Sequence, residues 1–239
     1  MDTYDFSDLW NSRLAIYTRY ALAFIVVLLL IAGTVLFFMF RSQPAFYREL
    51  MDVPVESLVE PAAKAEEKSL SLQQEVRHVG KTWKIELSES EINGWLAHTL
   101  AKKYTSHIPN GLSNPRIRID GENLDVAFQV EQSGLRGVVS LTASIEQIEP
   151  DLFSLHTKSY RIGALPIPRE QVRDIVLQVV RRLRGVQIEE LDEKDGIKFS
   201  IRLAPPRPGG PKIRIDQLRI QNGSLVFSGE TQRSGVGSR

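Results

Sequence analysis

The chain contains no cysteine, so a disulfide scaffold and thiol chemistry are excluded. Charge of one sign is also lacking, because 30 Lys and Arg residues stand against 29 Asp and Glu residues and leave a net charge of +1. Such a chain has no overall basic field to attract nucleic acid. We therefore expect no nucleic-acid partner, and only local arginine clusters to favour an anionic membrane surface.

Motifs for catalysis and metal binding are lacking as well. The four histidines, His78, His98, His107 and His156, are scattered without a His-x-x-x-His pair, so no zinc site is expected. No Gly-x-Ser-x-Gly elbow, phosphate-binding loop or dinucleotide fingerprint occurs. The acidic stretch 189–195 is typical of a solvated loop. We therefore expect no catalytic residue, no metal and no cofactor, and a protein that is not an enzyme.

One long apolar run is present. Residues 20–40 carry no charge and lie between Arg19 and Arg41. At about 1.5 Å per residue, a helix of this length crosses the roughly 30 Å hydrocarbon layer of a bilayer. A cleaved signal peptide has a shorter apolar core of about 7–15 residues and a small-residue cleavage site, which this run lacks. The sequence therefore predicts a single transmembrane helix over residues 20–40.

The orientation of this helix does not follow from charge, because Arg13 and Arg19 precede it and Arg41 and Arg48 follow it closely. A short N-terminal tail usually stays in the cytoplasm while the downstream domain is exported. We therefore expect a single-pass protein of the cytoplasmic (inner) membrane, with residues 1–19 as a cytoplasmic tail.

Three further segments are expected after the span. Residues 41–80 are predicted to be a stalk or linker, because the stretch 61–77 is rich in Glu, Ala, Lys and Gln and poor in apolar residues. Residues 81–230 are predicted to be an extracytoplasmic domain that folds without the stalk. Residues 231–239 are predicted to be a disordered tail.

The first helix of the domain has a distinct start signal. Ser88 and Glu91 have the spacing of a capping box, so a helix is expected from there to about Lys103, with Trp95 on its apolar face. Asn93 and Gly94 are poor helix formers. Such residues are often kept for a backbone hydrogen bond or a close contact.

Between residues 115 and 162 the apolar pattern changes to a period of two, which predicts an antiparallel meander with one dry face. The dry positions are Ile117, Ile119, Leu124, Val126, Phe128, Val139, Leu141, Ala143 and Ile145.

Gly163, Pro166 and Pro168 then interrupt the pattern, and Pro168 stands where a helix prefers proline. A second amphipathic helix is expected to follow, with Ile175 and Val179 facing the sheet. The predicted fold class is α+β: a curved antiparallel sheet packed on one or two amphipathic helices, preceded by a transmembrane helix.

Three motifs in this order resemble a family of uncharacterised single-pass bacterial membrane proteins of the planctomycete type. They are Pro44-Ala-Phe-Tyr-Arg48, Ser-Glu-Ser-Glu-Ile-Asn-Gly-Trp-Leu from Ser88, and Gly-Ala-Leu-Pro-Ile-Pro from Gly163. The resemblance covers residues 44–227. The chain is more distantly similar to extracytoplasmic tubular lipid-binding proteins, in which a curved antiparallel sheet wraps a long helix. This resemblance implies a lipid or another apolar ligand, held in a groove between the dry face of the sheet and the helices.

The same dry residues equally form a solid core. The alternative function is therefore an envelope assembly or scaffold protein that acts through protein–protein contacts. An apolar cavity of several hundred Å³ would favour ligand binding. A core packed at the usual density would favour the scaffold.

Overall fold

The computed structural model confirms the α+β class, with helices and antiparallel strands. The structure describes residues 6–103, 111–132, 134–168, 170, 186–193, 196–203, 212–221 and 223–233. The second amphipathic helix expected after Pro168 falls outside these ranges, and so do Ile175 and Val179.

The strands form two sheets instead of the single sheet expected. The small sheet has the order β1-β10-β9, and the large sheet has the order β2-β3-β4-β5-β8-β7, with β6 paired to β5. A period of two shows which side of a strand is dry but not which strand lies beside it. The strands are β1 (Thr82–Ser88), β2 (Leu112–Asp120), β3 (Asn123–Gln132), β4 (Leu135–Glu149), β5 (Leu152–Ile162), β6 (Leu165–Pro166), β7 (Val186–Glu193), β8 (Gly196–Leu203), β9 (Lys212–Gln221) and β10 (Ser224–Gln232).

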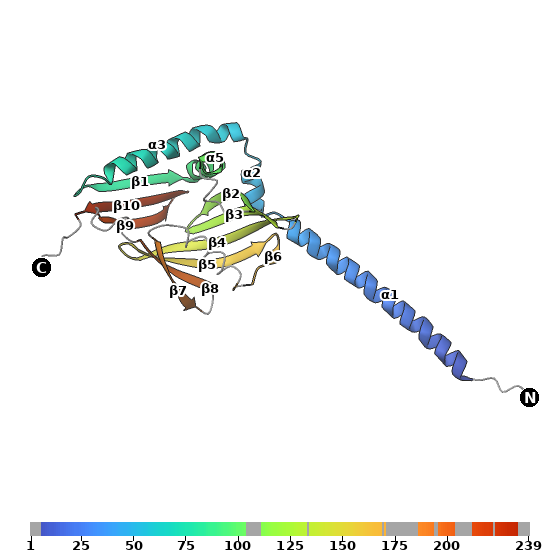
Figure 1. Cartoon of the computed structure of the whole chain (residues 1–239). Helices are drawn as coiled ribbons and strands as arrows, with labels where there is room; N and C mark the ends of the chain where they lie inside the picture. The colour runs from blue at the N-terminus through green and yellow to red at the C-terminus, as the bar shows by residue number, and fades with distance from the viewer. Residues whose placement is uncertain are drawn as a thin grey trace, which may run out of the picture.

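Helix α1 (Phe6–Arg41) projects away from the body of the molecule (Figure 1). Within the described part of the chain it is the one helix long and apolar enough to cross a membrane, over Leu22–Arg41. The large side chains of this stretch are exposed, as a lipid-facing surface requires. The helix is thus compatible with a single membrane anchor.

The segment expected to be a stalk is instead part of the domain, which corrects the boundary at residue 81. Helix α2 (Ala45–Met51) buries Tyr47 completely. A 3₁₀ turn, Val55–Leu58, leads into α3 (Val59–Glu75), which lies along β1 and buries Ala62 and Ala65 (Figure 1). Because α3 packs through alanines, its buried side lacks the large apolar residues by which a sequence pattern is recognised.

Two other boundaries differ from expectation. The predicted helix from Ser88 to Lys103 is α4 (Glu89–Gly94), then a wider π-helical turn over Trp95–Leu100, then α5 (Ala101–Lys103). The expected disordered tail begins too early, because β10 continues to Gln232. Thr231 is fully buried, and its hydroxyl donates to the carbonyl of Val76 over 3.0 Å.

Candidate functional site

The dry positions of the meander share one face of the large sheet, here called the apolar face. The register places Ile117, Val126 and Leu141 side by side across β2, β3 and β4. Residues paired directly across antiparallel strands point to the same face. The same register aligns Ile119 with Leu124 and Ala143, aligns Phe128 with Val139, and continues along β4 to Ile145.

The apolar face is only partly covered. Ile117, Ile119, Val139 and Ala143 are buried. The remaining predicted groove residues of the described chain stay partly exposed: Leu124, Val126, Phe128, Leu141 and Ile145. Within the described part of the chain, these five side chains therefore leave apolar surface open.

Ile167 covers one end of this face. It is buried together with Val139, and Phe128, Leu141 and Tyr160 pack against the pair. The prolines on either side of it, Pro166 and Pro168, are exposed. The predicted Gly163–Pro168 motif thus folds Ile167 onto the sheet.

Gly163 and Gly137 form a junction with the end of α1. The backbone N–H of Ala164 donates to the carbonyl of Met39 over 2.8 Å. Gly163 has φ +62°, and a Cβ at this position would collide with the Met39 and Phe40 carbonyl oxygens. A Cβ at Gly137 would come within 3.0 Å of the Phe40 ring. The end of α1 is therefore docked on the sheet, next to Val139.

The opposite face of the large sheet is covered by α2. Tyr47, Ala127 and Val138 form a buried cluster there. The Tyr47 hydroxyl donates to the Asn114 carbonyl over 2.9 Å. Burial raises the pKa of Tyr47 to about 12, and nearby Arg116 opposes this shift.

Arg116 is a buried charge that the sequence pattern did not indicate. It is only 5% exposed, and one guanidinium N–H donates to the Pro115 carbonyl over 2.8 Å. Burial lowers the pKa of Arg116, and Tyr47 opposes this shift. In the sequence, Arg116 alternates with Ile117 and looks like an ordinary position on a wet face.

Helix α4 closes the free edge of β2. The side-chain amide of Asn93 donates to the Ile117 carbonyl over 2.7 Å and accepts from the Ile117 N–H over 2.9 Å. The Glu89 carboxylate accepts from the Ile119 N–H over 2.7 Å. These bonds replace a neighbouring strand and protect the edge from pairing with another chain.

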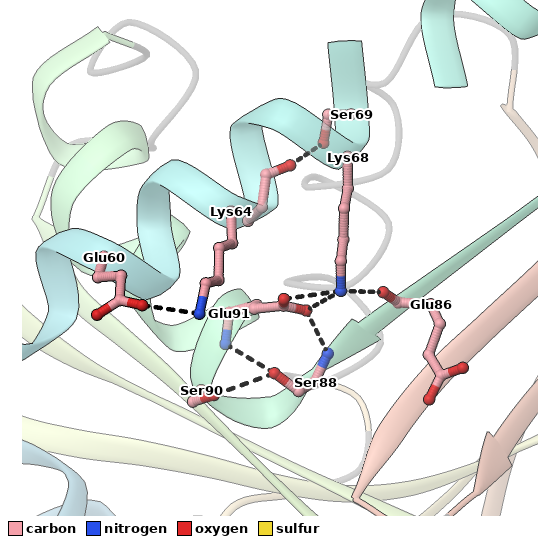
Figure 2. A network of polar contacts seen from close by, with 9 residues as sticks. Glu60, Lys64, Lys68, Ser69, Glu86, Ser88, Ser90 and Glu91 are labelled. Atoms are coloured by element: carbon pink, nitrogen blue, oxygen red, sulfur yellow. Dashed lines mark hydrogen bonds and ion pairs between the residues drawn. The ribbon is translucent and has the colours of Figure 1, made fainter. Parts of the chain in front are cut away.

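The predicted capping box joins α4 to α3 (Figure 2). Ser88 and Glu91 bond reciprocally, and the Lys68 ammonium lies 2.7 Å from the Glu91 carboxylate. Burial alone would raise the pKa of Glu91, but the bonds from Lys68 and Ser88 outweigh it and hold the pKa below its usual value. Lys68 also donates to the Glu86 carbonyl over 2.8 Å (Figure 2).

Gly94 allows the two helices to touch. A Cβ there would lie 2.7 Å from the Ala62 nitrogen and 2.9 Å from the Leu58 oxygen. Trp95 follows at the start of the π-helical turn and is half-buried. Ser88, Glu91, Asn93 and Gly94 thus hold the architecture together, and their bonds are all made within the protein.

The described part of the chain includes three open grooves. The largest, about 990 Å³, lies between β4 and β9. The second, about 330 Å³, lies between α3 and β1. The third, about 360 Å³, lies at the end of α1 beside Arg41 and Arg136. Of the predicted groove residues that the structure describes, Ile145 alone lines any of these three.

Metal ligands do not gather in the residues that the structure describes, where no three His, Asp or Glu side chains form a group. The chemistry available at the apolar face is therefore burial of apolar surface, and at the β4–β9 groove it is hydrogen bonding and charge.

No protein-family model, curated protein or solved structure matches this chain.

Proposed function

We propose that the chain is a membrane-anchored, non-enzymatic domain that binds a lipid acyl chain or another apolar ligand on the apolar face. In this proposal α1 spans the cytoplasmic membrane, and the domain lies on its outer side. No cofactor takes part. The observation that carries the proposal is the position of the face: it begins where the membrane-spanning helix is docked, at Gly137 and Gly163.

The junction supports this function through geometry. Phe40 ends the apolar run and contacts Gly137, which is two residues from Val139 on the apolar face. An acyl chain leaving the bilayer at this point would meet Phe128 and Leu141 without crossing a wide layer of water. Each buried methylene contributes about 0.8 kcal/mol, so a few half-exposed side chains are enough to hold a chain.

Site-specific photo-crosslinking tests the proposal in the full chain. A benzophenone side chain is placed at Phe128 or Leu141 on the apolar face, or at exposed Lys158 as the control. After illumination in bacterial membranes, mass spectrometry should find lipid adducts at the first two positions and none at Lys158. Protein without adducts at Phe128 and Leu141 would show that the face is closed to lipid.

A second function, an envelope scaffold acting through protein–protein contacts, is favoured by a different observation. The groove between β4 and β9 is lined mainly by polar residues and lies away from most of the apolar face. Such a surface suits a polypeptide better than an acyl chain.

A further inference from the structure

Strand β4 extends beyond its neighbour β3. Asn123, the first residue of β3, pairs with Ser144, whereas β4 continues to Glu149. Along Ile145–Glu149, β4 keeps β5 on one side. Among the strands that the structure describes, none pairs with this stretch on the side of β3.

The groove of about 990 Å³ lies on that open side. Its walls are formed by residues 144–150 of β4 and the turn after it, and by residues 216–221 of β9. Glu122, which directly precedes β3, lines the end of the groove. The groove therefore lies where β3 would pair with β4 if β3 were longer.

Strand β9 forms the other wall of the groove, and its edge away from β10 is bonded in part to side chains of β4 and of the turn after it. The Gln147 side chain already occupies one position on that edge. Its amide donates to the Asp216 carbonyl over 2.8 Å and accepts from the Leu218 N–H over 3.1 Å. Gln147 thus takes up main-chain groups of β9, and Asp151 does the same at Ile215, whose N–H donates to its carboxylate over 2.6 Å.

The carboxylates of the groove favour a positively charged occupant. Among the described residues that line it, Glu122, Glu146 and Glu149 are exposed, and the one exposed guanidinium is that of Arg219. Apolar side chains of Ile148 and Ile220 stand among them. A matching segment would carry basic side chains interspersed with apolar ones.

The position and charge of the groove favour a protein over the bilayer as its partner. Gly137, at one end of β4, contacts α1, and the groove begins at Ser144 and ends beyond Glu149. At about 3.4 Å per residue, Glu149 lies roughly 40 Å along the strand from that junction. Its carboxylates would also repel anionic lipids.

We propose that the groove between β4 and β9 binds an extended, basic segment of a partner protein, which adds as a strand along the open side of β4, with β9 as the facing wall. Main-chain hydrogen bonds would supply the affinity, and the carboxylates would supply the preference for Lys and Arg. The proposal is independent of lipid binding, and it gives the scaffold function a specific surface.

Peptide selection on the full chain in lipid nanodiscs tests this proposal. A displayed library of random seven-residue peptides is selected, and the enriched peptides are measured by fluorescence polarisation. We expect enrichment of Lys or Arg interspersed with β-branched residues. The double variant Glu146→Lys, Glu149→Lys should weaken binding about tenfold or more, because attraction becomes repulsion.

The matched control is Glu56→Lys, Glu67→Lys, which makes the same charge change at exposed positions outside the groove. It should leave the dissociation constant within about twofold. Should the groove variant fail to fold, Glu122→Lys reverses one charge at the end of the groove. Enrichment of acidic peptides, or peptides that bind all variants equally, would overturn the proposal.

N-methylation of the enriched peptide separates strand addition from simple charge attraction. Methyl groups on alternate backbone nitrogens remove ladder donors and should abolish binding, while the charge stays unchanged. Binding that survives N-methylation of each of the two alternate sets of backbone nitrogens would overturn the strand geometry.

Discussion

Tyr47 and Asn93 are the residues through which the domain satisfies buried polar groups. Tyr47 is completely buried and Asn93 is 2% exposed. Both donate to backbone carbonyls of β2, at Asn114 and at Ile117. A buried backbone group without a partner is costly, so each residue is expected to contribute more to stability than its size suggests.

Because the pKa of Tyr47 is raised by burial, we expect the domain to lose stability at alkaline pH. Burial raises its pKa from 10.0 to about 12, so the folded state holds the phenol proton more tightly than the unfolded chain does. The protonated phenol contributes fully to the free energy of unfolding below pH 10. As the pH rises through about 12, the free energy of unfolding falls by about 3 kcal/mol. Denaturant unfolding of the parent and of Tyr47→Phe from pH 8 to 12 measures it.

Tyr47→Phe should cost about 1–2 kcal/mol at pH 8, because the Asn114 carbonyl loses its donor. The difference from the parent should then shrink as the pH approaches 12. Tyr160→Phe, on the opposite face, is the control and should leave the alkaline loss in place. A constant difference between parent and Tyr47→Phe across this pH range would contradict the prediction.

Asn93→Leu should destabilise the domain by about 2–4 kcal/mol, because the N–H and carbonyl of Ile117 lose both bonds while remaining next to α4. Urea unfolding measures the change. Ser90→Ala, at an exposed position of the same helix, is the control and should unfold close to the parent. Equal midpoints for Asn93→Leu and the parent would show that water replaces the amide.

At the scale of elements, the arrangement depends on glycines that let backbones approach. Gly94 brings α4 against α3, and Gly163 brings the β5–β6 turn against the end of α1. Both contacts are between main chains, so neither can be relieved by moving a flexible side chain. They set the positions of the helices relative to the sheets.

Gly163→Ala should loosen α1 from the large sheet, because the added methyl group collides with the Met39 and Phe40 carbonyls. Since the chain has no cysteine, spin labels can be attached at Tyr20→Cys and Arg77→Cys without removing native thiols. The parent should give a narrow distance distribution by pulsed electron paramagnetic resonance. Gly163→Ala should broaden it.

Gly121→Ala is the matched control for this experiment. Gly121 has φ +59°, close to that of Gly163, but a Cβ there meets nothing within 4 Å. Gly121→Ala therefore introduces the same backbone strain without the collision. The prediction fails if both variants broaden the distribution to the same extent.

At the scale of the whole molecule, the two ends of the domain meet. Strand β1 pairs with β10 from Thr82 opposite Glu230 to Ser88 opposite Ser224. Helix α3 lies over this pair, and its last turn receives the hydroxyl of Thr231 at the Val76 carbonyl. The described residues from α2 to β10 therefore form one structural unit.

Truncation should reveal this unit. A chain starting at Gln43 should unfold cooperatively on heating, because it keeps Tyr47 and the alanines of α3. A chain starting at Lys81 loses Tyr47, Leu58, Ala62 and Ala65 from the buried set, and it should aggregate or melt without a clear transition. Circular dichroism and sedimentation distinguish the two. Equal melting curves for the two chains would show that residues 43–80 are a stalk outside the domain.

The proposed topology predicts that everything after Arg41 is outside the cytoplasm. Alkaline phosphatase fused after Gln232, where β10 ends, should be active, because the enzyme requires export. A cytoplasmic reporter such as β-galactosidase at the same position should be inactive. The reverse pattern would place the domain inside the cell and contradict the proposal.

Local sequence determined the features that depend on periodicity and spacing. The long apolar run, the dry face of β2, β3 and β4, and the Ser88–Glu91 capping box all appear in the structure as expected. Each follows from neighbours a few residues apart, where the geometry of a helix or strand sets which side chains share a face.

Tertiary structure alone decided how the elements are assembled. The pairing of β1 with β10, the inclusion of α3 in the domain and the groove between β4 and β9 bring together residues far apart in the chain. Alternation is the same for every possible strand order. Alanine and glycine contacts, as at Ala62 and Gly94, carry no apolar pattern from which a partner could be inferred, because close backbone approach requires small side chains.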